Sequence, residues 1–307
     1  MALRFREAAV AVKAETTKGT AISLAGTDAV YLAYDVAIAA DREISSRSPI
    51  RGTLSNVITA GKTTGSVSFR AEVVPSGTAG TAPDMSAALL ACGLALTTSA
   101  GVSDTYAPET TTSSFTVGVF HDGVKYILKG ALASCSLSAT VGEPMMATFT
   151  FTGLFDDVTD ESNPTISYGT VSTPVMVGVT CTVGGTSCSL ANWSMEIGHE
   201  IAIPTSATGA MGLTDYAIPM GRTISGSLDP LLELVATRDD FGVLAAGTEQ
   251  DIILTVGDTA GSKFTITVND ALLSKVSVSD REGAAVANLE WQSGSAAGDD
   301  EFELKFF

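Results

Sequence analysis

Hydrophobic and polar side chains alternate with a period of two over most of the chain, which is the pattern of strands with one buried face. In the first half, the alternation predicts strands at 9–15, 30–38, 65–73, 113–120, 124–132, 134–141 and 146–154. In the second half, it predicts strands at 177–183, 193–203, 223–230, 250–258, 262–268, 272–280, 285–291 and 301–307. Turn residues separate these segments, so we expect an all-β protein of the sandwich or barrel type.

Two short apolar segments depart from this alternation and predict helices. They read SAALLACG at 86–93 and DFGVLAAG at 240–247. Aspartate favours a helix start, and glycine favours the left-handed position just after a helix end. We therefore expect Gly93 and Gly247 to occupy turn or helix-cap positions, with one short helix flanking each β-unit.

The second half of the sequence repeats the first, block by block and in the same order. Segment 34–41 matches 193–200, which places Ile38 over Ile197, and segment 145–153 matches 285–294, which places Phe151 over Trp291. Three further blocks match between them: 61–69 with 221–229, 86–93 with 240–247, and 125–134 with 263–274. The repeat favours a tandem duplication with domains at 1–155 and 176–307 and a linker at 156–175. The alternative is a single long β-rich domain whose strands resemble one another.

One segment between two predicted strands is unusually long. Residues 41–63 far exceed the roughly two to five residues of an ordinary hairpin loop, and they contain Arg42, Arg47 and Arg51. One interpretation is a flexible surface loop. The other is an arm that reaches a neighbouring subunit, where its arginines would find acidic partners. On the second interpretation, these three arginines are candidates for contacts between rings.

The composition narrows the function classes. The chain of 307 residues has 45% hydrophobic side chains, enough for a full core, and its 34 acidic against 17 basic residues give a net charge of −17. Such a surface repels phosphate, which argues against tight nucleic-acid binding. The N-terminus lacks the apolar core of a signal peptide, and no window approaches the roughly 18 apolar residues of a membrane span. We therefore expect a soluble product made in the cytoplasm, without a membrane partner.

No arrangement of residues indicates catalysis, a metal site or a cofactor. The two histidines, His121 and His199, have no partners at metal-ligand spacing, and on a strand His199 faces away from Glu196 and Glu200. Segment 256–263 lacks the spacing of a phosphate-binding loop. We therefore predict no catalytic, cofactor-binding or metal-binding residues, and a protein that is not an enzyme.

The four cysteines do not form the framework of a disulfide-rich protein. Cys181 and Cys188 flank a Gly-Gly turn that would place them opposite each other on a hairpin, a geometry compatible with a cross-strand disulfide. In a cytosolic product we favour two reduced thiols.

An ordered set of segments resembles a known family. These are AVKAETTKGT (11–20), TAGKTTGSVSF (59–69), SGTAGTAP (76–83) with LLACG (89–93), GVKYILKGALAS (123–134) and MATFTFTGLF (146–155). Together they resemble the major tail tube protein of bacteriophages with long, non-contractile tails. The resemblance covers residues 4–165 well and the rest more loosely. The second half lacks the arginine-rich arm and the SGTAGTAP loop, so equal roles for the two halves are not expected.

The resemblance implies a structural virion protein of a siphovirus-like tail, assembled in the host cytoplasm. In that family single-domain subunits form hexameric rings, so a subunit with two copies of the fold implies homotrimeric rings with pseudo-sixfold symmetry. Stacked rings would form the channel for double-stranded DNA, which passes without tight binding. The implied partners are further copies of the chain, a tape measure protein, the tail terminator and distal tail or baseplate proteins. The alternatives are a β-rich binding module, adhesin-like or capsid-decorating, and the tube protein of a contractile tail or secretion machine.

Overall fold

The computed structural model describes residues 4, 6–30, 33–166, 172–209, 212–295 and 297–307. The first half contains one 3-10 turn, one short helix and eight strands: β1 (Ala8–Ala14), η1 (Gly26–Asp28), β2 (Ala33–Arg47), β3 (Val57–Glu72), α1 (Ser86–Ala91), β4 (Leu94–Ser99), β5 (Ser103–Pro108), β6 (Phe115–His121), β7 (Val124–Thr140) and β8 (Met146–Asp160). The second half contains β9 (Thr180–Val183), β10 (Thr186–Cys188), β11 (Asn192–Ala202), β12 (Ile218–Leu228), α2 (Asp240–Ala246), β13 (Gln250–Val256), β14 (Phe264–Arg281), β15 (Ala284–Ser293) and β16 (Phe302–Phe306). The predicted all-β class, with one short helix in each half, is confirmed.

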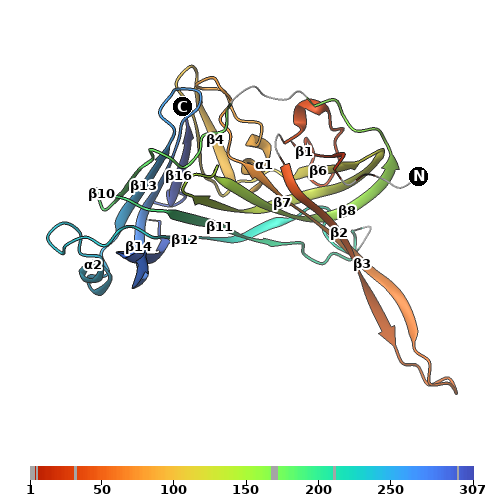
Figure 1. Cartoon of the computed structure of the whole chain (residues 1–307). Coiled ribbons are helices and arrows are strands. Elements are labelled where there is room, and N and C mark those ends of the chain that lie inside the picture. Colours follow the sequence, from red (N-terminus) through yellow and green to blue (C-terminus); the bar gives the residue numbers. More distant parts are fainter. Residues whose placement is uncertain (1–3, 5, 31–32, 167–171, 210–211, 296) are drawn as a thin grey trace.

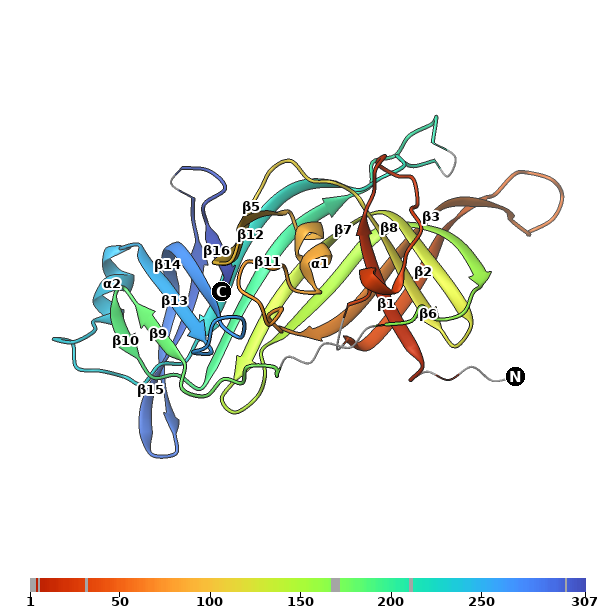
Figure 2. The ribbon, with the colours of Figure 1, turned by 90° about the horizontal axis from the view of Figure 1, so that it is seen from above.

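The strands form one long antiparallel sheet that curves through the whole molecule (Figure 2). Its order is β10-β9-β13-β14-β15-β12-β11-β7-β8-β3-β2. The remaining strands extend this path: β1 pairs with β6 and β6 with β7, while β16 links β14 to β5 and β5 pairs with β4.

Both halves of the chain follow one strand order. The first half is ordered β1-β6-β7-β8-β3-β2, and the second half is ordered β9-β13-β14-β15-β12-β11. Along the chain, a short helix follows the fifth strand of each order, α1 after β3 and α2 after β12. β7 and β14 also carry left-handed residues at matching places, Gly130 with a φ of 58° and Asp270 with a φ of 47°. Each strand of these two orders therefore has a counterpart in the other half, whereas β4, β5, β10 and β16 lie outside them.

The two halves meet inside the sheet, where β11 pairs with the C-terminal part of β7. The register sets Ile197 opposite Cys135 and Met195 opposite Leu137. β8 extends into the predicted linker at 156–175 as far as Asp160, which pairs with Val124. Residues 167–171 of that linker lie outside the described part of the chain.

The main hydrophobic core covers one face of the sheet and runs through both halves, and a small separate cluster contains Ala9, Ala11 and Phe120. Phe69, Phe149 and Phe151 pack together, and the rings of Phe69 and Phe151 stack with centroids 5.8 Å apart. Trp193 and Trp291 are fully buried in the second half. Each such aromatic ring removes a large apolar surface from water, which stabilises the sheet against the layer that covers it. In the first half α1 belongs to that layer, since Ala88, Leu89 and Ala91 are buried in the same core.

The opposite face of the sheet is polar and rich in small hydroxyl side chains. These side chains alternate with the core residues along five adjacent strands and are partly or fully exposed: Ser66, Ser68, Ser134, Ser136, Ser138, Thr148, Thr150, Thr152, Ser194, Ser225 and Ser227. Strand geometry explains the contrast, because neighbouring side chains point to opposite faces.

The long segment 41–63 is not a loop but the outer part of a two-stranded ribbon. β2 and β3 remain paired out to Arg47 and Val57, so only residues 48–56 form the connection. The ribbon projects well beyond the body of the molecule (Figure 1). The counterpart between β11 and β12 forms no such ribbon in its described residues, where one isolated bridge joins Thr205 to Leu213.

Candidate assembly surfaces

The three arginines predicted for inter-ring contacts all lie on the ribbon, and each donates to a neighbouring hydroxyl. Arg42 Nε lies 2.9 Å from Thr63 Oγ1, and Arg47 Nη2 lies 2.7 Å from Thr59 Oγ1. At the tip, Arg51 Nη2 bonds Ser55 Oγ at 2.9 Å. Within the described part of the chain, none of the three takes part in an ion pair. Their positive charges are therefore open to acceptors from another molecule.

The ribbon also carries apolar side chains that sequence reasoning missed. Ile44 lies opposite Ala60 and Ile58 opposite Ser46, so the two isoleucines share one face of the ribbon. Ile50 and Leu54 at the tip are fully exposed. The polar residues around Ile44 and Ile58 hid this pattern in the sequence. Exposed apolar groups on a projecting ribbon indicate a surface that another molecule covers.

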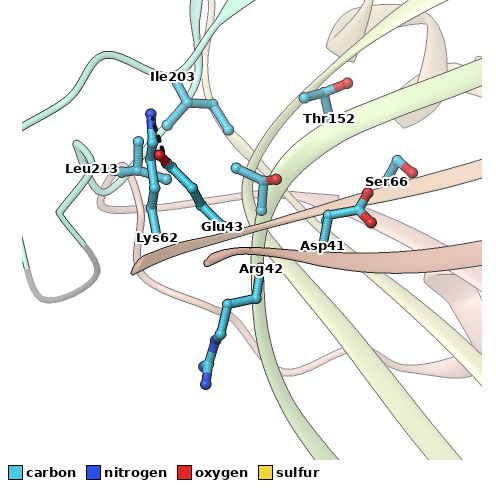
Figure 3. A pocket seen from close by; sticks show the side chains of 10 residues that line it. Asp41, Arg42, Glu43, Lys62, Ser66, Thr152, Ile203 and Leu213 are labelled. Carbon is cyan, nitrogen blue, oxygen red and sulfur yellow. Dashed lines mark ion pairs between the residues drawn. The ribbon is translucent and has the colours of Figure 1, made fainter. Parts of the chain in front are cut away.

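A groove of about 590 Å³ lies at the root of the ribbon, where it meets the connection between β11 and β12. Its lining includes Asp41, Glu43, Lys62, Ile203 and Leu213. Lys62 Nζ lies 3.4 Å from Glu43 Oε2 across the ribbon. Figure 3 shows these side chains around the groove, with Arg42 projecting to the other side of the ribbon.

Among the open strand edges of the described structure, those of β2 and β14 lie at matching places in the two halves. β2 pairs with β3 along one edge only. On β14, β13 pairs as far as Ala271 and leaves the same edge open from Leu273 to Arg281. The corresponding part of β7, Cys135–Thr140, is the part that pairs with β11.

Side-chain exposure marks the same difference between β7 and β14. Cys135 lies opposite Phe149, and Val276 lies opposite Leu289, the residue that the sequence repeat matches to Phe149. Leu137 follows Cys135 by two residues on β7, and Val278 follows Val276 by two residues on β14. The side chain of Leu137, next to β11, is 1% exposed, whereas that of Val278 is 52% exposed. The open edge of β14 therefore exposes an apolar side chain at the position that is buried on β7.

The two helix ends differ in what covers them. Gly93 and Gly247 both have left-handed backbones, with φ of 77° and 61°. The imidazole of His199 packs on Gly93, so closely that a Cβ there would lie 3.1 Å from its Cε1, whereas a Cβ on Gly247 would meet no atom within 4 Å. His199 Nδ1 is 3.1 Å from the carbonyl oxygen of Ala133, and burial lowers the pKa of His199.

The remaining candidate chemistry is sparse. Cys181 and Cys188 lie directly opposite each other on β9 and β10 as free thiols that contact one another, and this contact with burial raises the pKa of Cys181. Among the described residues there is no group of three histidine, cysteine or acidic side chains that could hold a metal ion. Within the same part of the chain, no helix has the length and apolarity needed to cross a bilayer.

An elongated sheet with open edges and a projecting ribbon is an architecture that suits a subunit that polymerises. The family model described as phage tail tube protein matches residues 6–293, and the chain belongs to this family. It is accordingly a structural, non-enzymatic protein of the virion tail that assembles into a tube. No curated protein matches the chain.

Proposed function

We propose that the chain is the major tail tube subunit of a long, non-contractile phage tail and that it forms trimeric rings with pseudo-sixfold symmetry. The repeated strand order supports this proposal, because it fits a tandem duplication into domains at 1–155 and 176–307. A subunit with two equivalent units makes a ring of three chains resemble a ring of six.

The single observation that carries the proposal is the pairing of β11 with β7 inside the chain. β2 is the counterpart of β11, and β14 is the counterpart of β7, and both have an open edge at the matching place. Antiparallel pairing of β2 with β14 of the next copy repeats the internal junction between chains. An open edge is an association hazard unless it is paired, and a closed ring of strands removes it.

The polar face of the sheet is the proposed lining of the channel. The core and α1 occupy the opposite face, which leaves the hydroxyl-rich face uncovered. Its acidic side chains include Glu196, Glu200 and Glu290, of which Glu290 pairs with Lys275 at 2.6 Å. Hydroxyls offer only weak contacts and carboxylates repel phosphate, so double-stranded DNA would slide along this surface without tight binding.

The outer ribbon is proposed to contact the neighbouring ring in the stack. Arg47 and Arg51 have charges open to acidic partners, and Ile50 and Leu54 offer apolar anchors beside them. A tape measure protein would occupy the channel during assembly, and the tail terminator and distal tail proteins would close its two ends.

A charge placed on the open edge of β14 tests the ring proposal. Val278→Asp buries a carboxylate in the β2–β14 junction, so the variant should remain monomeric at concentrations where the wild-type chain forms trimers and tubes. Sedimentation equilibrium gives the mass, and negative-stain images of tubes give the rotational symmetry. Val158→Asp, at an exposed valine near the end of β8, is the matched control and should still form trimers.

Both variants change exposed side chains, so their thermal unfolding should match the wild type. A wild-type chain that remains monomeric at high concentration, or rings of six chains, would overturn the trimer. Trimers unaffected by Val278→Asp would exclude this edge as the junction.

A further inference from the structure

The junction inside the chain supplies a residue-by-residue template for the proposed junction between chains. One ladder of opposed residues runs from Ile38 through Val67 to Phe151. The matching ladder runs from Met195 through Gly226 to Trp291. Since Phe151 and Trp291 correspond in the sequence repeat, Ile38 occupies the place of Met195.

This correspondence differs by two residues from the one read from sequence, which set Ile38 over Ile197. Both strands continue without a register shift for four more residues, so Arg42 stands in the place of His199. Their partners correspond in the same way, Thr63 opposite Arg42 and Arg222 opposite His199.

His199 makes a contact that crosses the internal junction. It lies on β11 in the second half, but its imidazole packs on Gly93 at the end of α1 in the first half. Its Nδ1 hydrogen-bonds the carbonyl of Ala133 on β7. The side chain therefore joins a strand of one unit to the helix end and the adjacent strand of the other.

The equivalent place at the other helix end is open. Nothing lies within 4 Å of a Cβ built on Gly247 at the end of α2. Leu273 on β14 corresponds to Ala133 on β7, because Ala133 faces Phe151 and Leu273 faces Trp291. The exposed carboxylate of Glu249 follows two residues after Gly247.

Arg42 has the direction and the chemistry to occupy that place on a second copy. It projects to the side of the ribbon opposite Asp41, which is the side of the core residues (Figure 3). Its guanidinium carries five N–H donors, and the described structure uses one of its nitrogens on Thr63. Backbone carbonyls at a helix end and a nearby carboxylate are suitable acceptors.

We propose that Arg42 of one copy packs against Gly247 at the end of α2 on the next copy, within the same ring, as His199 packs against Gly93 within the chain. The contact rests on the proposed trimer and deepens it by naming the residues at the junction. It moves Arg42 from the contact between rings, which the sequence predicted, to the contact within a ring.

Three substitutions on the ribbon separate these two locations. Arg42→Ala should weaken the trimer by roughly tenfold or more in sedimentation equilibrium, because the guanidinium contact is lost. Arg42→His should retain most of the trimer affinity, since histidine fills the equivalent place inside the chain. Arg47→Ala, the matched control further out on the same ribbon, should leave the trimer unchanged.

A substitution at the other side of the contact tests it independently. Asparagine tolerates a left-handed backbone, so Gly247→Asn should keep the unfolding temperature of the monomer yet weaken the trimer by filling the space for Arg42. Gly185→Asn is the control, because Gly185 has a left-handed backbone and equally open surroundings in a turn.

The outcomes are distinguishable from failure of the ring proposal. Normal trimers but fewer or shorter tubes for Arg42→Ala would place Arg42 between rings and overturn this inference while leaving the trimer intact. Trimers that tolerate both Arg42→Ala and Gly247→Asn would also overturn it. Absence of wild-type trimers would remove the ring proposal and this contact together.

Discussion

At the scale of single residues, the buried carboxylate of Glu15 shows most clearly how the fold of the first half is held. It is almost fully buried and accepts hydrogen bonds from Gly19 N at 2.7 Å and from the left-handed Gly130 N at 2.8 Å. The hydroxyls of Ser114 and Thr116 complete its partners. One side chain thus ties the N-terminal segment to β6 and to the bulge in β7.

Removing this carboxylate should destabilise the folded chain without acting on the surfaces proposed for assembly. Glu15→Ala leaves buried donors without an acceptor, and we expect it to lower the free energy of unfolding by about 2 kcal/mol. Urea titration followed by circular dichroism measures the change. Glu109→Ala, at an exposed glutamate, should be neutral; equal effects of the two substitutions would contradict the role of Glu15.

At the scale of elements, the alternation of side chains predicted most strands, and it failed where bulges interrupt it. The segments 124–132 and 134–141 are one strand, β7, and 262–268 with 272–280 are one strand, β14. Left-handed residues at Gly130 and Asp270 reset the alternation, so one strand reads as two. β4 was missed because threonine and serine fill its second half, and β5 was missed because its buried positions include Ser103 and Asp104. α1 begins without the aspartate cap that the sequence suggested.

The ribbon is the element whose exposed apolar side chains most clearly indicate a contact with another molecule. An isolated two-stranded ribbon is marginally stable in water, and this one exposes Ile44 and Ile58 on one face. Its length was predictable from sequence, but its extended pairing was not, because polar side chains on both strands conceal the alternation. Its stability therefore depends on the assembled tube.

Removal of the two apolar groups at the tip should weaken stacking but not ring formation. For Ile50→Ser combined with Leu54→Ser, we expect trimers of normal affinity and unfolding temperature, because both side chains are fully exposed in the single chain. Tubes should become shorter or require higher protein concentration, as measured from electron micrographs and by light scattering. Val102→Ser, at an exposed valine of the β4–β5 turn, serves as control. Tubes of unchanged length would exclude the tip from the stacking contact.

At the scale of the whole molecule, acidic and hydroxyl side chains dominate different parts of the surface. The net charge of −17 repels DNA from the tube as a whole, yet the proposed channel face is dominated by serine and threonine rather than by acids. Sequence alone could not distinguish these faces, because the hydroxyl residues on five strands become one surface only after the sheet order is known. The same order reveals that β2 and β14 have open edges at matching places.

Placing positive charge on the hydroxyl face should turn a sliding surface into a binding one. Thr150 is exposed at the middle of β8, and Thr150→Arg would set an arginine at each equivalent place around the ring. Assembled tubes of this variant should bind a short labelled DNA duplex at low salt, with an affinity that falls steeply as salt rises, whereas wild-type tubes should not. Fluorescence anisotropy measures both. Thr111→Arg, at an exposed threonine outside the sheet, adds the same charge elsewhere. Stronger binding by the Thr111 variant than by the Thr150 variant would show that the hydroxyl face does not line the channel.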